Sequence, residues 1–220
     1  MAARTGSAEG RKYRGISPIQ RRAERRAKLI EAGIHIFGSQ GFHAATVKQI
    51  CSTARLTERY FYESFENLNA LFGAAYDHQL ERLRDTMVQA LAGAPRNVEA
   101  MAETLLRAYY NILQREPLLA RILLIEIYGT TQDMNRLYQR GVLDFAQLVR
   151  GIIQANFRLE RQDGLDAGLI STAVIGAAIH LGTGWYLSGY RESLETMVTN
   201  SHAIITAVTE KLTTRMPQAG

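Results

Sequence analysis

The chain has little of what disulfide-bonded proteins and many hydrolases depend on. Its one cysteine, Cys51, excludes an intramolecular disulfide. Its five histidines are scattered, and no His-Glu-x-x-His, Cys-x-x-Cys or Gly-x-Ser-x-Gly pattern occurs. We therefore expect no catalytic residues, no metal site and no cofactor. We interpret Cys51 as a small buried residue, with a redox sensor as the alternative.

Proline and strand-forming patterns are scarce as well. The 220 residues include only four prolines, and no alternating Val, Ile and Thr pattern is bounded by turn residues. An all-α fold is therefore expected. The first helix should begin after the N-cap Ser17 and end at Gly38 and Gly41. Apolar residues at helical spacing predict further helices at about 67–91, 97–115, 117–129, 131–157, 165–189 and 193–214.

Acidic residues are nearly absent from the start of the chain. Residues 1–28 contain nine Lys or Arg against Glu9 and Glu24, whereas the rest contains 17 basic and 19 acidic residues. A basic segment on a near-neutral body fits phosphate binding by one end of the molecule. A solvated flexible tail is the alternative. Residues 1–15 include no apolar stretch typical of a signal peptide, so a cytoplasmic location is expected.

Charged residues are also missing from positions 167–190, which contain no Asp, Glu, Lys or Arg. The length would suffice to cross a bilayer. The segment nevertheless carries five glycines and His180, which makes it weakly hydrophobic for lipid. We therefore expect a helix packed against other helices, and no membrane partner.

The most informative stretch is residues 46–65, where two short helical patterns meet with no room for a long loop. Val47, Ile50 and Cys51 fall on one face of the first pattern, and Phe61 and Phe65 line the second. Two helices joined by a tight turn form a helix-turn-helix, whose second helix enters the DNA major groove N-terminus first. Thr57 is a natural N-cap for that helix, and the polar residues beside it are not needed by a core. The sequence therefore predicts a DNA-binding protein.

This unit resembles the TetR/AcrR family of bacterial transcriptional regulators. The resemblance covers about residues 20–75 and rests on Gly41-Phe42, Thr46-Val47-x-x-Ile50, Ala54-x-Leu56-Thr57, Phe61-Tyr62-x-x-Phe65 and Leu71. It implies that Thr46 and Tyr62 touch DNA phosphates and that the start of the 57–65 helix reads bases. The DNA-contacting residues expected on these grounds are Thr46, Val47, Lys48, Thr57, Glu58, Arg59, Tyr60, Tyr62 and Ser64. Two positions depart from the family pattern: Arg55 replaces the usual turn glycine, and Leu68 replaces a phosphate-binding lysine.

The body of the chain offers a few polar groups within apolar segments. Glu126 lies within an apolar run, and His180 interrupts the uncharged helix. A buried ligand site is usually apolar with a few placed polar groups. The residues expected at such a site are Tyr109, Glu126, Tyr128, Phe145, His180 and Trp185. Ordinary core packing explains each of them as well, although the resemblance implies a small, often hydrophobic effector in the body.

The resemblance also implies dimerisation through the last two long helices, over residues 165–214. We expect a basic arm at 1–16, a helix-turn-helix domain at 17–66, and a helical effector-binding and dimerisation domain at 67–220. The leading hypothesis is a homodimeric repressor that binds double-stranded operator DNA and is released by a small hydrophobic effector. The alternatives are an effector-independent DNA-binding protein and an α-helical enzyme with a degenerate helix-turn-helix.

Overall fold

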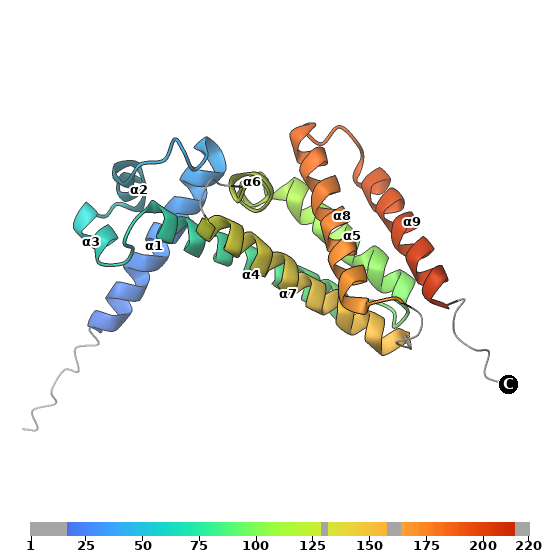
Figure 1. The fold of residues 1–220 in the computed structure, drawn as a ribbon. Helices are drawn as coiled ribbons and strands as arrows, with labels where there is room; N and C mark the ends of the chain where they lie inside the picture. Colours follow the sequence, from blue (N-terminus) through green and yellow to red (C-terminus); the bar gives the residue numbers. More distant parts are fainter. Residues whose placement is uncertain (1–16, 129–131, 158–163, 214–220) are drawn as a thin grey trace, which may run out of the picture.

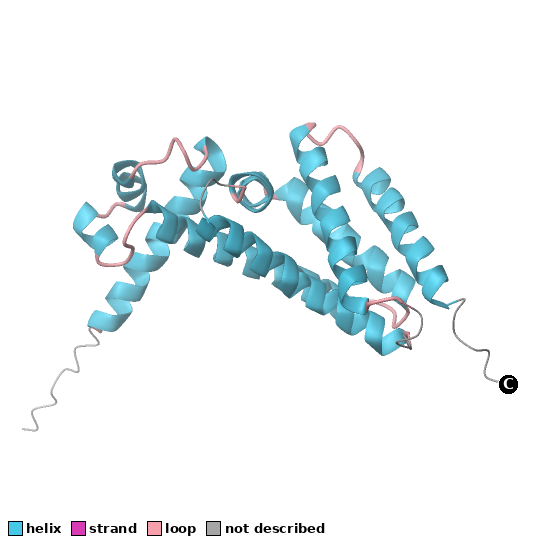
Figure 2. Cartoon of the chain, in the orientation of Figure 1, coloured by secondary structure: helices cyan, strands magenta, loops and turns pink. Residues whose placement is uncertain are grey.

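A computed structural model describes residues 17–128, 132–157 and 164–213, and every regular element in these ranges is helical (Figures 1 and 2). The all-α expectation is confirmed. The elements are α1 (Pro18–Gln40), α2 (Val47–Ala54), α3 (Glu58–Tyr62), α4 (Leu68–Ala92), α5 (Val98–Arg115), α6 (Pro117–Arg121), the π-helical η1 (Ile122–Glu126), α7 (Gln132–Asn156), α8 (Ala167–Leu187) and α9 (Leu194–Thr213). Residues 1–16, where the basic arm is expected, lie outside the described residues.

We call α1 to α3 the head and the elements from α4 onward the body. Local sequence explains where the helices around the head begin and end. The Ser17 hydroxyl accepts the amide of Gln20, whose side chain accepts the amide of Ser17, so α1 begins with the expected capping box. α1 continues through Gly38 to Gln40 and is ended by Gly41 alone, at φ 92°. The expectation that Gly38 helps to end α1 is therefore wrong. α4 begins after Asn67, whose side-chain oxygen accepts the Ala70 amide at 2.9 Å.

Helix α4 joins the head to the body. It packs against α1 at its beginning and against α5 and α7 further along (Figure 1). In the body, α7 packs on α8 and α5 packs on α9. One hydrophobic core runs from Leu29 of the head to Val198 of α9 without interruption. The edge-on contact of Phe37 with Phe72, at 5.4 Å between ring centroids, belongs to this core.

Helix α8 is apolar but covered on one side only. Its sequence is long and hydrophobic enough to cross a bilayer, yet only 11% of that stretch is buried within the chain. Most of its exposed residues recur every three or four positions, as Leu169, Ala173, Gly176, His180, Gly184 and Leu187, and Thr172 is exposed beside them. The expected packing of this helix against others is thus found on one face, and an uncharged face remains open.

Candidate DNA-binding surface and ligand cavity

The turn between α2 and α3 keeps its left-handed geometry without a glycine. Arg55 adopts φ 55° and ψ 43°, and the amide of Leu56 donates to the carbonyl of Cys51 at 2.9 Å. A left-handed backbone costs a residue with a side chain about 1–2 kcal/mol. Buried Ile50, Cys51 and Phe61 hold the two helices on either side of this turn. The replacement of glycine by Arg55 therefore leaves the helix-turn-helix intact.

Helix α2 begins with a second capping box. Thr46 accepts the Gln49 amide through its hydroxyl, and its own amide donates to the Gln49 side chain. Thr46 and the neighbouring Lys48 are exposed, whereas Val47 is partly buried against the core. The two exposed side chains therefore lie on the surface beside the start of α2.

Helix α3 is shorter than the expected 57–65 segment and covers five residues. Thr57 is its N-cap with an extended backbone, but its side chain makes no capping hydrogen bond. Glu58 and Arg59 follow on the surface, and 84% of the Arg59 side chain is exposed. Arg59 Nε donates to Glu63 Oε1 at 3.0 Å. Since this ion pair lies at the surface, it holds Arg59 only weakly.

Arginines of α1 brace α3 from behind. Arg22 donates to the backbone carbonyl of Glu63 at 2.8 Å. The Arg25 guanidinium lies 4.4 Å from the centre of the Tyr60 ring and 3.9 Å from the Glu63 carboxylate. Arg26 lies 4.9 Å over the Phe65 ring. These cation–π and hydrogen-bonding contacts fix the orientation of α3 relative to α1.

Glu63 was not among the residues expected from the sequence. Its role is structural, because one carboxylate contacts both the exposed Arg59 and the bracing Arg25. The signal in the sequence was the spacing of Arg59 and Glu63, which places them on one face of a helix.

The nine expected DNA-contacting residues share one end of the molecule but differ in exposure. Exposed are Thr46, Lys48, Thr57, Glu58, Arg59 and Tyr62, and partly buried are Val47, Tyr60 and Ser64. The ring of Tyr60 already makes a cation–π contact with the Arg25 guanidinium. Leu68 packs against the hydrophobic core at the start of α4 and is unable to contact a phosphate as a lysine would. Contacts of these residues with DNA stay a prediction.

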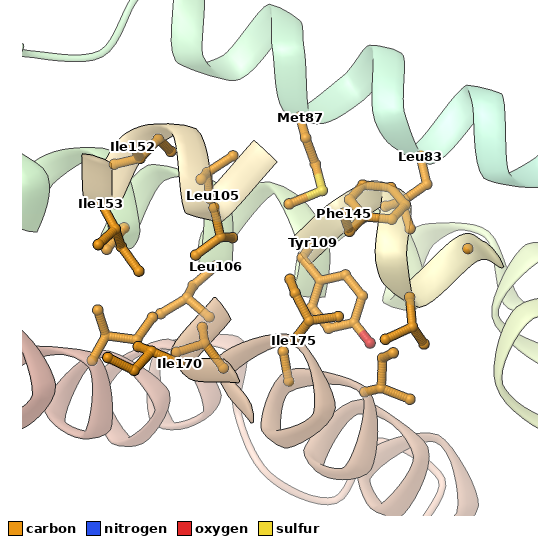
Figure 3. A pocket seen from close by; sticks show the side chains of 18 of the residues that line it. Leu83, Met87, Leu105, Leu106, Tyr109, Phe145, Ile152, Ile153, Ile170 and Ile175 are labelled. Carbon is orange, nitrogen blue, oxygen red and sulfur yellow. The ribbon is translucent and has the colours of Figure 1, made fainter. Parts of the chain in front are cut away.

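The body contains an apolar cavity of about 140 Å³ between α4, α5, α7, α8 and α9 (Figure 3). A cavity of roughly 150 Å³ lined by Leu, Ile and Phe accommodates a benzene molecule. The lining side chains come from every one of these helices and from η1, and no charged residue is among them in the described part of the chain. The labelled residues Leu83, Met87, Leu106, Phe145, Ile170 and Ile175 show how the side chains converge (Figure 3).

The cavity brings together only some of the residues expected at a ligand site. Tyr109 and Phe145 line it. Tyr128 and His180 are exposed, and Trp185 is buried in the core with its indole N–H donating to the Glu192 carbonyl at 2.9 Å. Glu126 faces the head instead. The lining that the sequence did not single out is aliphatic for the most part, and helical spacing alone does not distinguish such residues from ordinary core residues.

Three tyrosines and Thr209 supply the polar groups of the cavity, and the Thr209 hydroxyl donates to the Thr206 carbonyl at 2.9 Å. Tyr76, Tyr109 and Tyr138 line it from α4, α5 and α7. Burial raises the pKa of Tyr109 and that of Tyr76, so both hydroxyls stay protonated. The Tyr109 hydroxyl is fully buried and has no hydrogen-bond partner among the described residues.

Glu126 connects the cavity wall to the head. Its carboxylate accepts the Phe42 amide at 2.8 Å and the Arg121 Nε at 2.8 Å. Arg121 also donates to the Ser39 carbonyl at 2.8 Å. Leu123 and Leu124 of the same η1 segment line the cavity. A single π-helical turn therefore contacts both the cavity and the end of α1.

Comparisons with known proteins agree with this geometry. Residues 29–75 match the family model described as bacterial regulatory proteins, tetR family. An uncharacterised HTH-type transcriptional regulator of Bacillus subtilis, YdgC, is 24% identical over 173 residues, which cover 77% of this chain and 85% of the relative.

Solved structures share the fold at lower identity. The fatty acid degradation regulator FadR of Bacillus halodurans has a TM-score of 0.70 at 17% identity and covers 82% of this chain and 93% of its own. FadR of B. subtilis, solved in complex with stearoyl-CoA, has a TM-score of 0.70 at 15% identity over 81% and 96% of the two chains. The N-terminal helix-turn-helix head therefore matches the tetR family of bacterial regulatory proteins, and the chain as a whole shares the fold of these solved regulators.

Proposed function

We propose that this regulator is a homodimeric repressor that acts in the cytoplasm and leaves its operator when a small apolar molecule occupies the cavity. The observation that carries the proposal is the position of the cavity against α4. Leu80, Leu83 and Met87 of α4 line the cavity, while Leu71 and Phe72 at the beginning of the same helix are fully buried in the core shared with the head. A ligand that displaces α4 therefore also displaces the head.

The open face of α8 supports the dimer. Leu169 and Leu187 on α8 are 73% and 67% exposed, and Ile204 on α9 is 48% exposed. Burial of this uncharged surface against a second copy would remove apolar area from water, the main driving force for association. A dimer also supplies two recognition helices, which must reach successive major grooves about 34 Å apart. An effector that changes their separation lowers operator affinity.

The apolar lining and the stearoyl-CoA bound by the B. subtilis relative support a lipophilic effector. The start of α4 after the N-cap Asn67 supports a proposed domain boundary at 66/67. We propose that residues 17–66 contact DNA through the nine residues named above, and that the following residues bind the effector and the partner subunit.

A cavity-filling variant tests the proposal. Operator fragments are first selected from genomic DNA by binding to the wild-type protein, and a panel of neutral, anionic and cationic lipophiles is screened for release. Ala178 lines the cavity, so Ala178→Leu should occupy part of its volume. The variant should bind the operator normally and resist release. Ala177→Leu, one position along α8 and outside the lining, is the matched control and should respond like the wild type.

Two outcomes would favour the alternatives. If no lipophile stabilises the protein or releases it from the selected DNA, the protein binds DNA without an effector. If the protein selects no fragments above background, its helix-turn-helix is degenerate and an enzymatic role of the body becomes the better hypothesis.

A further inference from the structure

The Tyr109 hydroxyl is the starting point, because it is a buried donor without a partner. Tyr109 lines the cavity, and its ring lies among carbon atoms between Phe145 and Ile175 (Figure 3). A buried hydroxyl that makes no hydrogen bond destabilises the folded protein. Each such group therefore points to a missing partner.

The Tyr109 hydroxyl lies against Gly182 of α8. A Cβ atom at Gly182 of α8 would lie 2.6 Å from the Tyr109 oxygen, so only glycine leaves space for the hydroxyl there. Tyr110, the next residue, has a partner: its hydroxyl lies 2.7 Å from Ser201 Oγ. The protein thus provides a hydrogen-bond partner for Tyr110 but not for Tyr109, which lines the cavity.

The charge around the cavity limits what the missing partner can be. The lining contains no Lys, Arg or His in the described ranges and no Asp or Glu either. A buried ion without an opposite charge is strongly disfavoured. A carboxylate, phosphate or ammonium group inside the cavity would therefore have no counter-ion.

A surface groove of about 560 Å³ adjoins the cavity between α4 and α7. Leu80 and Phe145 line both spaces, so they form the partition between them. The charged residues of the groove are the acids Asp77, Glu81 and Asp144 and the bases Arg84 and Arg140. Arg140 is already paired with Asp77. This net negative groove does not favour a polyanionic headgroup outside the partition.

We infer that the ligand is an uncharged, mostly apolar molecule with one hydrogen-bond acceptor, such as a ketone, ester or lactone oxygen, which accepts the hydroxyl of Tyr109. The inference rests on the proposed function, because it names the class of effector for that same cavity. It separates this chain from a regulator that binds acyl-CoA, whose headgroup carries several negative charges.

Three probes of similar size and different polarity test the inference on the full chain without DNA. They are 2-heptanone, its isostere 2-methyl-1-heptene, which replaces the carbonyl oxygen by a methylene group, and heptanoate at pH 7. Dissociation constants are obtained from the rise of the unfolding temperature with ligand concentration in sealed calorimeter cells. Tyr109→Phe is the test variant, and Tyr110→Phe is the matched control.

Tyr109→Phe should weaken the binding of 2-heptanone about fivefold, which is the effect of one neutral hydrogen bond. The binding of 2-methyl-1-heptene should not change. Tyr110→Phe should change the affinity for neither ligand. Heptanoate should bind at least about tenfold more weakly than the ketone. Without ligand, Tyr109→Phe should be no less stable than the wild type, whereas Tyr110→Phe should be less stable because it leaves Ser201 unpaired.

The outcomes separate the inference from the proposed function. If both neutral probes bind and Tyr109→Phe weakens them equally or not at all, the hydrogen bond is refuted and the effector cavity stands. If heptanoate binds most tightly, the ligand is anionic and the inference is overturned. If none of the probes binds to the wild type, the proposed effector site fails together with the inference.

Discussion

At the scale of single residues, the recognition surface depends on a few side chains held by others. Arg59 is exposed and tied only to Glu63, which in turn contacts Arg25 on α1. This arrangement leaves the Arg59 guanidinium free to exchange one acceptor for another at little cost. Tyr62 is also exposed, at 60%, but it lies at the end of α3. We therefore expect Arg59 to contact a base and Tyr62 to contact a phosphate.

Arg59→Ala should lower operator affinity by about 1–3 kcal/mol and relax the preference at one base pair, because alanine is unable to donate two hydrogen bonds to guanine O6 and N7. Binding to a library with randomised operator positions measures both effects. Tyr62→Phe is the control and should weaken all sequences alike, since a phosphate contact carries no sequence information. Unchanged discrimination by Arg59→Ala would exclude it as a base-reading residue.

Cys51 shows how far single residues were predictable. Its side chain is 4% exposed, and burial raises the pKa of its thiol, with a smaller contribution from the charge of Glu58. A buried thiol of raised pKa reacts slowly, in keeping with the interpretation as a small core residue. The ligand-site residues were less predictable. Tyr109 and Phe145 line the cavity, but the apolar run around Glu126 gave no sign that its carboxylate faces the head.

At the scale of elements, helix ends were predictable wherever a capping side chain marks them. Ser17 begins α1 as expected, with both hydrogen bonds of the capping box in place. The recognition helix was overestimated because Phe65 continues the apolar spacing of Phe61, although the regular α-helix ends at Tyr62. The π-helical turn η1 was not foreseen, because the apolar run at 122–127 fits any helical period. Its position between cavity and head depends on tertiary packing.

Glu126→Gln should loosen the connection between body and head. A charge-assisted hydrogen bond contributes about 1.5–3 kcal/mol, and the Glu126 side chain is only 11% exposed. The Phe42 amide should therefore exchange its hydrogen faster, and ligand should release the operator less effectively. Hydrogen exchange and operator titrations with and without ligand measure the two effects. Glu116→Gln removes a carboxylate that pairs with Arg82 and makes no contact with the Phe42 amide, so it should leave Phe42 protected.

At the scale of the whole molecule, the distribution of charge and apolar surface governs assembly on DNA. Three arginines of α1 are engaged within the head, where they contact α3 and Phe65. Leu68 packs into the core and supplies no phosphate contact. We therefore expect further phosphate contacts from exposed Lys48 and from residues 1–16, which contain Arg4, Arg11, Lys12 and Arg14.

Deletion of residues 1–16 should lower operator affinity and make its salt dependence shallower. For every phosphate that the truncated protein no longer neutralises, the slope of log K against log salt should fall by about 0.9. Anisotropy titrations at several salt concentrations measure the slope. An unchanged slope in the truncated protein would show that the segment does not contact the backbone of DNA.

Gly176→Glu should dissociate the dimer and abolish tight operator binding, because a carboxylate buried in an apolar interface has no partner. Gly176 is open, with no heavy atom near the position of a Cβ, so the substitution should leave the folded subunit intact. Gly182 packs inside the subunit against Tyr109, and Gly182→Ala should lower stability without changing the assembly. Light scattering decides the matter: a wild-type mass near 24.6 kDa, that of one chain, would refute the dimer.

The continuity of the core has a consequence for building chimeric regulators. Phe37 packs on Phe72, and the Phe42 amide is held by Glu126, which lies 84 residues further along the chain. A transplanted DNA-binding segment that ends at residue 66 would lack both Phe72 and Glu126, and the apolar surface that packs on α4 would be exposed. Exchange of operator specificity between relatives should therefore succeed when the transplanted piece carries α1 to the first turns of α4 and the recipient retains its own Arg121 and Glu126. In this protein the DNA-binding head therefore depends on the first turns of α4 for its folding.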